Sequence, residues 1–523
     1  MKGKIKTFEF SRSGFDEIKR YHFGVNWPSV YLIQNTKEIY IGEAVNVFNR
    51  SRQHYESADR RRLDTIHLIT DDEFNKSAAL DVESLLIQYM IADGKFVLQN
   101  KAAGLVDHNY FDKEKYRAKF DLLWDELKVM SLVQNELVDI RNTNLFKFSP
   151  YKALTEDQNN VGEEILKHIR ASESGAYIVN GGPGTGKTIL ATHLVKRFKE
   201  IEGLSNLKVG LVVPMTSLRG SLQKVFRKVP GLKADMVIGP TDVIGGNYDV
   251  LIVDESHRLR QRINITNFKS FDDANNSLGL DKTGNELDWI MKSSRYQIFF
   301  YDKNQSFKPS DIKPSAFVNI GARPFFLTSQ KRVLGGEEYI QFIDDILNLR
   351  VPAQNKFEKY DFKIFDDIQE MVSGIKKKDE QYKLCRVVAG YAWEWKTKDN
   401  SDTFDIEIDG LKLVWNSTNS DWVNSPNALN EVGCIHTIQG YDLNYTGVII
   451  GPELSYDPIS KKIVVDKEKY KDINGKRSVD DPKELERYII NIYKTLLTRG
   501  IVGTYVYIVD PALREYFKSR FNN

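Results

Sequence analysis

Apolar side chains follow two different patterns along the chain. In the first part, residues 29–34 and 38–42 are short apolar runs joined by a polar turn, which predicts a hairpin of two strands. Residues 78–92 carry apolar side chains at helical spacing. Residues 111–147 alternate charged and apolar positions in a helical manner and predict one connecting helix, with a boundary at the polar stretch 141–144. The sequence therefore predicts a small mixed α+β domain followed by a helical connector.

The rest of the chain contains near-continuous apolar strands that alternate with helical segments. Such strands are buried on both faces and belong to parallel sheets covered by helices. They form a first series at 176–180, 209–214, 249–255 and 296–302, and a second at 383–390, 446–451 and 504–510. This pattern predicts an α/β protein with two parallel-sheet domains in tandem.

A chain of 523 residues is too long for one hydrophobic core, so several domains are expected. The patterns above predict four parts. They are a mixed domain at residues 1–110, the helical connector at 111–147, and the two α/β domains at 148–350 and 351–523.

Composition narrows the class of protein. Hydrophobic residues make up 41% of the chain and charged residues 28%, which is ordinary for a folded globular protein. No apolar run approaches the roughly 20 residues that cross a bilayer, and no signal peptide is evident. The two cysteines, Cys385 and Cys434, are too few for a disulfide framework or a cysteine zinc cluster. We therefore expect a cytoplasmic protein with no membrane partner.

The charge balance leaves a nucleic-acid partner open. The net charge is +2, which neither supports nor excludes such a partner. A short basic stretch that also carries His54 contains Arg50, Arg52, Arg60, Arg61 and Arg62. These side chains either meet phosphates or form a solvated helix face.

A glycine-rich loop is the strongest motif. Residues 181–188 read GGPGTGKT and lie between a predicted strand and a predicted helix, as G-x-x-x-x-G-K-[ST] requires. Backbone N–H groups of such a loop cradle phosphates, and the helix N-terminus favours their charge. Lys187 is expected to reach the β- and γ-phosphates of ATP, and Thr188 to bind Mg²⁺. The ATP-binding residues predicted here are Gly182, Gly184, Thr185, Gly186, Lys187 and Thr188.

Two acidic residues end the strand at 249–255. Asp254 and Glu255 lie where α/β proteins bind ligands, at the carboxyl end of a strand. We expect Asp254 to hold Mg²⁺ through water and Glu255 to polarise the attacking water. Paired acids can also be helix caps, but the upstream phosphate loop favours the catalytic interpretation.

Together with further short segments in a fixed order, these motifs make residues 150–515 resemble the superfamily 1 helicases. The segments are LTEDQ (154–158), VPMTS (213–217), YDKNQ (301–305), SQKR (329–332), TIQGYD (437–442) and TLLTR (495–499). The resemblance implies two RecA-like domains with the nucleotide between them. It implies that Gln158 reads adenine, Gln305 senses the γ-phosphate and Arg332 contacts the phosphates. It also implies that Gln439 and Gly440 belong to the T-x-x-Q-G segment, that residues 213–217 contact nucleic-acid phosphates, and that Arg499 is an arginine finger.

The second α/β domain carries a further likeness. Residues 386–395 and 431–451 resemble the helicase-like part of the larger Schlafen proteins, which allows RNA as a substrate. Four tryptophans in this part either stack on bases or pack in the core: Trp393, Trp395, Trp415 and Trp422. His257 follows the acidic pair and either relays the nucleotide state or has a structural role.

Residues 29–101 resemble a GIY-YIG endonuclease. Ser29-Val30-Tyr31 stands in place of Gly-Ile-Tyr, and Tyr40-Ile41-Gly42 matches the second signature. The later residues of the motif are Arg50, His54, Glu83 and Asn100. The first signature lacks its glycine and the spacing of the tyrosines is short, so a domain that only binds nucleic acid stays an alternative.

The nuclease resemblance implies a role for each of these side chains. Tyr31 or Tyr40 would deprotonate the attacking water, and Arg50 would stabilise the negative charge at phosphorus. Glu83 would bind one Mg²⁺ or Mn²⁺. His54 would assist proton transfer, and Asn100 would orient the site.

We therefore expect an ATP-dependent motor coupled to a metal-dependent endonuclease that acts on nucleic acid, with DNA favoured over RNA. A role in phage defence or repair rests on the architecture alone. The alternatives are an ATP-switched sensor or assembly protein, and an RNA-directed nuclease. A homo-oligomer or a partner protein from a defence system stays open. The second domain, with Gln439 and Arg499, disfavours a small-molecule kinase.

Overall fold

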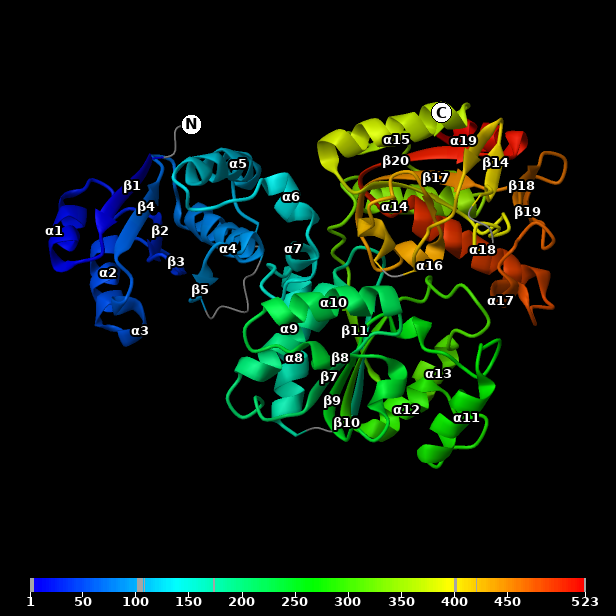
Figure 1. Cartoon of the computed structure of the whole chain (residues 1–523), viewed down its shortest axis with the longest axis horizontal. Coiled ribbons are helices and arrows are strands. Elements are labelled where there is room, and N and C mark those ends of the chain that lie inside the picture. Colours follow the sequence, from blue (N-terminus) through cyan, green and yellow to red (C-terminus); the bar gives the residue numbers. More distant parts are fainter. Residues whose placement is uncertain are drawn as a thin grey trace. The chain divides into compact units, whose positions relative to one another are not determined.

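The computed structural model describes residues 4–100, 107, 109–172, 175–398, 402–419 and 421–521. The chain divides into two compact units, residues 1–160 and 161–523, and each is described by itself (Figure 1).

The first unit is built on a mixed five-stranded sheet with the order β1-β4-β2-β3-β5. Its strands are β1 (Lys4–Glu9), β2 (Ser29–Gln34), β3 (Glu38–Ala44), β4 (Thr65–Thr70) and β5 (Val97–Leu98). The predicted hairpin is present as β2 and β3, and its register sets Tyr31 opposite Gly42. All pairs are antiparallel except β3 with β5.

Helices cover both faces of this sheet. They are α1 (Arg12–Arg20), α2 (Val47–Glu56), α3 (Ala58–Arg61), α4 (Lys76–Asp93), α5 (Lys113–Val129), α6 (Leu137–Asn142) and α7 (Asn144–Phe148). Val30 and Leu32 of β2 pack with α4 and α5 on one face. Tyr31 and Ile33 pack with α1 and α2 on the other. Because successive strand residues point to opposite faces, a strand covered on both sides is apolar throughout.

The segment 111–147 differs from the single helix that the sequence predicts. It forms α5, α6 and α7, with a break in which Ser131 has a φ of 55°. The Asp93 carboxylate accepts the backbone N–H groups of Gln134 and Asn135, which holds the chain in this turn. Apolar side chains of α5, among them Trp124, join the core of the first unit.

The second unit contains two parallel sheets. The first has the order β11-β6-β10-β9-β7-β8 and the second β12-β20-β17-β13-β16. Every pair in both sheets is parallel, which confirms the predicted parallel-sheet α/β class. The strands of the first are β6 (Gly175–Gly181), β7 (Val209–Val212), β8 (Val237–Ile238), β9 (Tyr248–Val253), β10 (Ser294–Tyr301) and β11 (Arg323–Leu327). Those of the second are β12 (Asp361–Phe365), β13 (Cys385–Ala389), β16 (Val432–Gly433), β17 (Leu443–Ile450) and β20 (Gly500–Ile508).

Two short hairpins and a set of helices complete the second unit. The hairpins are β14 (Ile406–Ile408) with β15 (Leu411–Leu413), and β18 (Leu454–Asp457) with β19 (Lys462–Val465). Around the first sheet lie α8 (Glu156–Arg170, which begins in the first unit), α9 (Lys187–Glu200), α10 (Thr216–Lys228), α11 (Phe268–Ser277), α12 (Glu286–Ser293) and α13 (Pro314–Asn319). The others are α14 (Gly336–Leu347), α15 (Ile368–Tyr382), α16 (Ile435–Ile438), α17 (Ile473–Lys476), α18 (Pro482–Leu497) and α19 (Pro511–Phe521).

The largest core of the second unit lies beside the second sheet. Apolar side chains of α14 and α18 pack there with strands β17 and β20. The Tyr339 hydroxyl on α14 donates to the carbonyl of Leu497 at the end of α18, at 2.8 Å. Helix α14 lies before residue 351, where the sequence predicts that the second α/β domain begins. It nevertheless packs with the second sheet.

Among the described residues, no helix is both long and apolar enough to span a bilayer.

Gly42 is needed where it stands because the ring of Tyr31 crosses it. A Cβ atom at Gly42 would lie 2.3 Å from the Tyr31 hydroxyl oxygen, and the Tyr31 side chain is buried. We expect Gly42→Ala to destabilise the fold by about 1–3 kcal/mol, the cost of overpacking a filled core. Thermal unfolding of the full chain checks this.

The matched control is Gly220→Ala in helix α10, where an added methyl group meets nothing within 4 Å. Since alanine favours a helix over glycine, this variant should be as stable as the wild type or slightly more stable. Equal melting temperatures for Gly42→Ala and wild type would mean that Tyr31 is not held over Gly42.

Candidate functional site

The glycine-rich loop joins β6 to α9 in the form that phosphate binding requires. Gly184 and Gly186 have φ angles of 80° and 74°, which lie in the left-handed region that glycine adopts without strain. The Lys187 ammonium donates to the carbonyls of Gly181 at 2.7 Å and Gly182 at 3.0 Å, and its side chain is buried. The lysine side chain is therefore held over the loop by backbone carbonyls of the loop itself.

The loop and the acidic pair meet as the sequence predicts. The Thr188 hydroxyl donates to the Asp254 carboxylate at 2.7 Å. Thr185 stabilises the loop by donating to the carbonyl of Gly182 at 2.9 Å. A hydroxyl and a carboxylate side by side are the hard oxygen donors that Mg²⁺ prefers. The donors at Thr188 and Asp254 thus fit the expected cation.

The two carboxyl groups of the acidic pair have opposite pKa shifts. Burial, followed by the charge of Glu255, raises the pKa of Asp254. Burial also acts to raise the pKa of Glu255, but the nearby His257, Lys187 and Arg499 outweigh it and hold that pKa below its usual range. Glu255 therefore stays ionised at the end of β9, which a group that polarises water needs.

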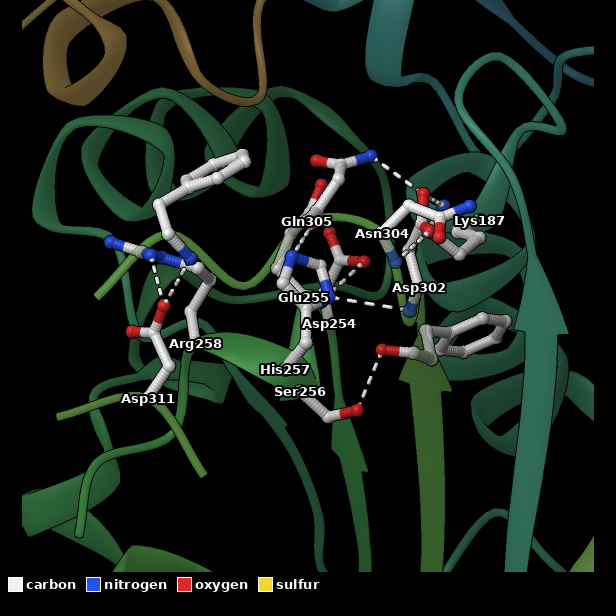
Figure 2. Close-up of polar contacts among 12 residues, drawn as sticks. Lys187, Asp254, Glu255, Ser256, His257, Arg258, Asp302, Asn304, Gln305 and Asp311 are labelled. Atoms are coloured by element: carbon white, nitrogen blue, oxygen red, sulfur yellow. Dashed lines mark hydrogen bonds and ion pairs between the residues drawn. The ribbon is translucent and has the colours of Figure 1, made fainter. Parts of the chain in front are cut away.

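His257 joins the acidic pair to the end of the neighbouring strand (Figure 2). It is fully buried, and its Nε2 lies 2.9 Å from Oε2 of Glu255. Its Nδ1 accepts the backbone N–H of Asp302 at 3.3 Å. Because Nδ1 is an acceptor, the ring proton is on Nε2, which faces the Glu255 carboxylate. The imidazole thus fixes the position of the Glu255 carboxylate from the β10 side.

The YDKNQ segment continues this network. The Asp302 carboxylate accepts the Gln305 amide N–H at 2.8 Å and lies 3.7 Å from the Lys187 ammonium. Gln305 is buried, and its carbonyl oxygen Oε1 has no hydrogen-bond partner among the described residues. Buried amides are usually satisfied, so this oxygen is free to accept a donor from a ligand.

Residues next to β17 and β20 of the second sheet reach the same place and meet Arg332, which follows β11 of the first sheet. Arg332 lies 2.5 Å from Asp442, and Arg499 donates to the carbonyl of Tyr441 at 3.1 Å. Burial, followed by the charge of Arg332, lowers the pKa of Arg499 to about 10. Arg499 in turn acts on Glu255, so the expected arginine finger and the acidic pair lie close together.

The remaining predicted nucleotide residues divide between the two units. The SQKR segment packs on the phosphate loop, since a Cβ atom at Gly184 would lie 2.8 Å from that of Arg332. Gln439 is buried with its Nε2 unpartnered among the described residues, and Gly440 has a φ of 86°. Gln158 lies in the first unit, where its side-chain oxygen accepts the backbone N–H of Thr155 at 2.9 Å.

The structure decides the alternative for two tryptophans and places Ser217 of the VPMTS segment in the interior. Residue Ser217 does not face outward toward phosphates: it is buried, and its hydroxyl lies 2.9 Å from that of Tyr441. Trp415 and Trp422 are also fully buried and pack in the second sheet's cores, so they do not stack on bases. Trp393 and Trp395 are half-buried against the same core as Trp415.

Comparison with known families decides what this arrangement belongs to. Residues 174–510 match the model of the Schlafen group 3 DNA/RNA helicase domain. The chain belongs to this family. The match covers both parallel sheets and every motif of the second unit, so the helicase domain is assigned without the first unit.

Single relatives add less than the Schlafen group 3 match. An uncharacterized protein of Saccharomyces cerevisiae, YPL245W, is 27% identical over 424 residues, which span 69% of this chain and 90% of that protein. The Pif1 helicase of Candida albicans is 12% identical with a TM-score of 0.29, covering 70% of this chain and 99% of that one. A Bacteroides Pif1 helicase in complex with ADP-AlF3 and ssDNA is 12% identical with a TM-score of 0.27, covering 66% and 91%. Scores at this level add nothing to the assignment.

Residues 1–173 lie outside the Schlafen group 3 match, and their candidate site stands on its geometry alone. His54 Nε2 lies 2.8 Å from the Tyr31 hydroxyl, and Tyr40 packs on the His54 ring at 4.8 Å. Arg60 lies 2.6 Å from the other ring nitrogen and 4.0 Å from the centre of the Tyr40 ring. Arginine only donates, so Nε2 of His54 carries the ring proton and the Tyr31 oxygen accepts it.

Arg50 and Glu83 also act on this group. Burial, followed by the charge of Tyr40, raises the pKa of Tyr31 well above its usual value and outweighs the nearby Arg50, which acts to lower it. Burial, followed by the charge of Glu43, raises the pKa of Glu83 to about 7. The order Tyr31, Tyr40, Arg50, His54, Glu83 predicted from the sequence is therefore one cluster in space.

Asn100 lies at the edge of the sheet. Its amide accepts the backbone N–H of Ile41 at 3.0 Å and donates to the carbonyl of Ile41 at 2.7 Å. Both ends of the side chain thus bind the backbone of β3 within the signature Tyr40-Ile41-Gly42. This fixes the strand that carries Tyr40, which is a positioning role.

Sequence reasoning missed two residues of the cluster. Arg60 appeared only as part of a basic stretch, because its contact with His54 depends on the turn between α2 and α3. Glu43 pairs with Lys76. It directly follows the second signature, and this neighbouring position in the sequence could have pointed to it. No group of three or more His, Cys, Asp or Glu side chains suited to a metal is found in the part of the chain that the structure describes.

His54 makes the stability of the first unit depend on pH. Burial, followed by the charges of Arg60 and Arg50, lowers the pKa of His54 to about 3. Between pH of about 6.5 and 3, the unfolded chain therefore binds a proton at His54 that the folded chain does not, so stability falls as the pH falls. We expect His54→Gln to flatten this part of the curve of melting temperature against pH.

Exposed His22 supplies the control. His22→Gln should follow the wild-type curve from pH 7 to 4. If His54→Gln follows it too, His54 takes up its proton in the folded state and the buried contact with Arg60 is wrong.

Proposed function

We propose that the protein is an ATP-driven nucleic-acid motor of the superfamily 1 type that carries a metal-dependent endonuclease module. Membership of the Schlafen group 3 helicase family supports the motor. The observation that carries the motor proposal is the convergence of charged groups from both parallel sheets on one phosphate loop. In this arrangement, the γ-phosphate of ATP would change how the two sheets hold each other.

Each side chain at the loop has a defined part in this proposal. Lys187 would exchange its two carbonyl contacts for the β- and γ-phosphates, and Thr188 and Asp254 would hold Mg²⁺. Bound Mg²⁺ would supply positive charge to the phosphates. Glu255 would orient the attacking water. Arg499 would approach the γ-phosphate from the second sheet and Arg332 from the loop after β11 of the first sheet, and the free oxygen of Gln305 would report its presence.

The connection between sheets is direct. Tyr441, which follows the T-x-x-Q-G segment, lies with its hydroxyl 2.9 Å from those of Ser217 and Ser221 on α10. Gly440 packs against Leu218 of the same helix. A change at Gln439 or Arg499 would therefore be felt at α10, which follows the VPMTS segment. This supports a motor in which hydrolysis moves one sheet relative to the other.

The first unit supports the nuclease part of the proposal. The Tyr31 oxygen receives the N–H of His54, and the nearby charge of Arg50 lowers the Tyr31 pKa, so both partly offset the cost of ionising a buried tyrosine. Glu83 provides a carboxylate beside this group for Mg²⁺ or Mn²⁺. DNA is the proposed substrate, and a role in phage defence or repair is proposed from the pairing of motor and nuclease alone.

ATP hydrolysis stimulated by single-stranded DNA or RNA tests the motor. Lys187→Ala should lower kcat by at least about 100-fold, because a positive charge at the transferring phosphate is lost. Lys228→Ala, which removes an exposed lysine of helix α10, should behave as wild type. Wild-type protein that fails to hydrolyse ATP with either nucleic acid would refute the motor.

His257 offers a finer test within the same assay. His257→Ala removes one hydrogen bond to Glu255, so kcat should fall about tenfold while KM changes little. Loss of His257 also raises the pKa of Glu255, so activity should be lost at a higher pH as the medium is acidified. A structural role for His257 would lower stability but leave the pH profile in place.

Cleavage of labelled DNA and RNA with Mg²⁺ or Mn²⁺, with and without ATP, tests the nuclease. Glu83→Gln should abolish cutting, on the order of 100-fold or more, with nucleic-acid binding retained. Since the pKa of Glu83 is about 7, wild-type cutting should rise as the pH increases through 7. Exposed Glu56→Gln is the matched control.

An ATP-switched sensor makes the opposite prediction. Such a protein would bind nucleic acid through the first unit and cut neither the DNA nor the RNA. Comparison of DNA and RNA in the same assay separates the DNA-directed from the RNA-directed enzyme.

A further inference from the structure

Glu43 stands out among the groups that the proposed function does not use. It is the last but one residue of β3, directly after the second tyrosine signature. Only 4% of its side chain is exposed, and its buried oxygen Oε1 has no hydrogen-bond partner among the residues that the structure describes. A buried carboxylate oxygen with no donor is costly, so its environment requires an explanation.

Two other charged side chains face this carboxylate, and both come from helix α4. The Lys76 ammonium pairs with the other oxygen of Glu43. Glu83 stands seven residues, or two turns, further along the same face of the helix. The charges of Glu43 and Lys76 both act on the pKa of the Glu83 carboxyl, which places the three groups close together.

Two carboxylates therefore lie beside one partly exposed ammonium group. The side chain of Lys76 is 55% exposed, so the ammonium can leave for water at little cost. A carboxylate pair at the edge of a sheet, open on one side, matches how Mg²⁺ is held, because this ion binds through one or two carboxylates, several waters and the phosphates of a substrate.

We propose that Glu43 and Glu83 together form the divalent-cation site of the first unit, and that the Lys76 ammonium competes with the cation for Glu43. This rests on the proposed nuclease function for its biological use, but the cation site itself can be tested without cleavage. The free oxygen Oε1 of Glu43 would be a ligand, while Glu83 would contribute from α4. Glu43 is thus a ligand in addition to the one that the nuclease resemblance implies.

The competition has a consequence for the substrate. When a cation displaces Lys76 from Glu43, the Lys76 ammonium is freed at the mouth of the same site. A nucleic-acid phosphate that binds the cation would also meet this positive charge. Cation and phosphate would therefore favour each other's binding, with Lys76 as the link.

Binding of Mn²⁺ to the full chain, followed by the electron paramagnetic resonance signal of the free ion, tests the proposal. All proteins would carry Asp254→Asn, so that the phosphate-loop site does not contribute. Glu43→Gln should weaken Mn²⁺ binding about tenfold, as should Glu83→Gln, because each removes one of two charged ligands. Lys76→Met should strengthen it by about threefold or more, because a competing cation is removed.

The double variant Glu43→Gln with Lys76→Met gives the sharpest result. Lys76 acts through Glu43, so the double variant should bind Mn²⁺ as weakly as Glu43→Gln alone. Lys115→Met is the matched control, since Lys115 pairs with exposed Glu73 and lies on α5. It should leave the affinity unchanged.

Stability provides a second readout that a purely structural ion pair would not reproduce. Lys76→Met leaves Glu43 unpaired, so this variant should melt below wild type without a cation and gain more than wild type when Mn²⁺ is added. Unchanged Mn²⁺ affinity in Glu43→Gln, or unchanged or weaker affinity in Lys76→Met, would overturn the proposal.

The failure of this site and that of the nuclease are distinguishable. If the Mn²⁺ affinities follow the expected order and no substrate is cut, the cation site stands and the nuclease function falls. If cutting requires Glu83 while the affinity ignores Glu43, the nuclease stands and the paired-carboxylate site falls.

Discussion

Burial of opposite charges around the phosphate loop is the constraint on which the second unit depends. Asp254, Glu255, Lys187 and Arg499 are all less than 10% exposed. Charges withdrawn from water in this way are stable only when partners lie close and in good geometry. The ends of β6 and β9 and the end of α18 must therefore meet at one point. Binding and hydrolysis of a nucleotide are natural uses of such a point, because the γ-phosphate would enter the same balance of charge.

The first unit depends on a similar balance at smaller scale. His54 is held neutral between two tyrosines and Arg60, and this orients its ring proton toward Tyr31. In the same unit, Glu43 and Glu83 share the charge of Lys76. In both units, groups that are expensive to bury lie at the ends or edges of strands, where a ligand can complete their partners.

Local pattern was enough to predict the elements but not how they pair. Continuous apolar strands between helices predicted two parallel sheets, and parallel sheets are present. The single helix expected at 111–147 is three helices, because Asp93 holds the turn after α5. Asp93 lies 41 residues before Gln134, whose backbone N–H it accepts. Helix α14 packs on the second sheet through Tyr339. Such contacts between distant residues have no signature in a short window of sequence.

The sequence by itself determined the phosphate loop, the order of the helicase motifs and five members of the nuclease-like cluster, but not Arg60 and Glu43, because spacing along a strand or a helix carries only the former. Only the tertiary structure decided which of them face each other. It buried Ser217, Trp415 and Trp422, which composition had left open. It also brought Glu43 of β3 into contact with Lys76 at the start of α4. The physical reason is that burial and charge pairing depend on three-dimensional distance, which residue type and spacing do not encode.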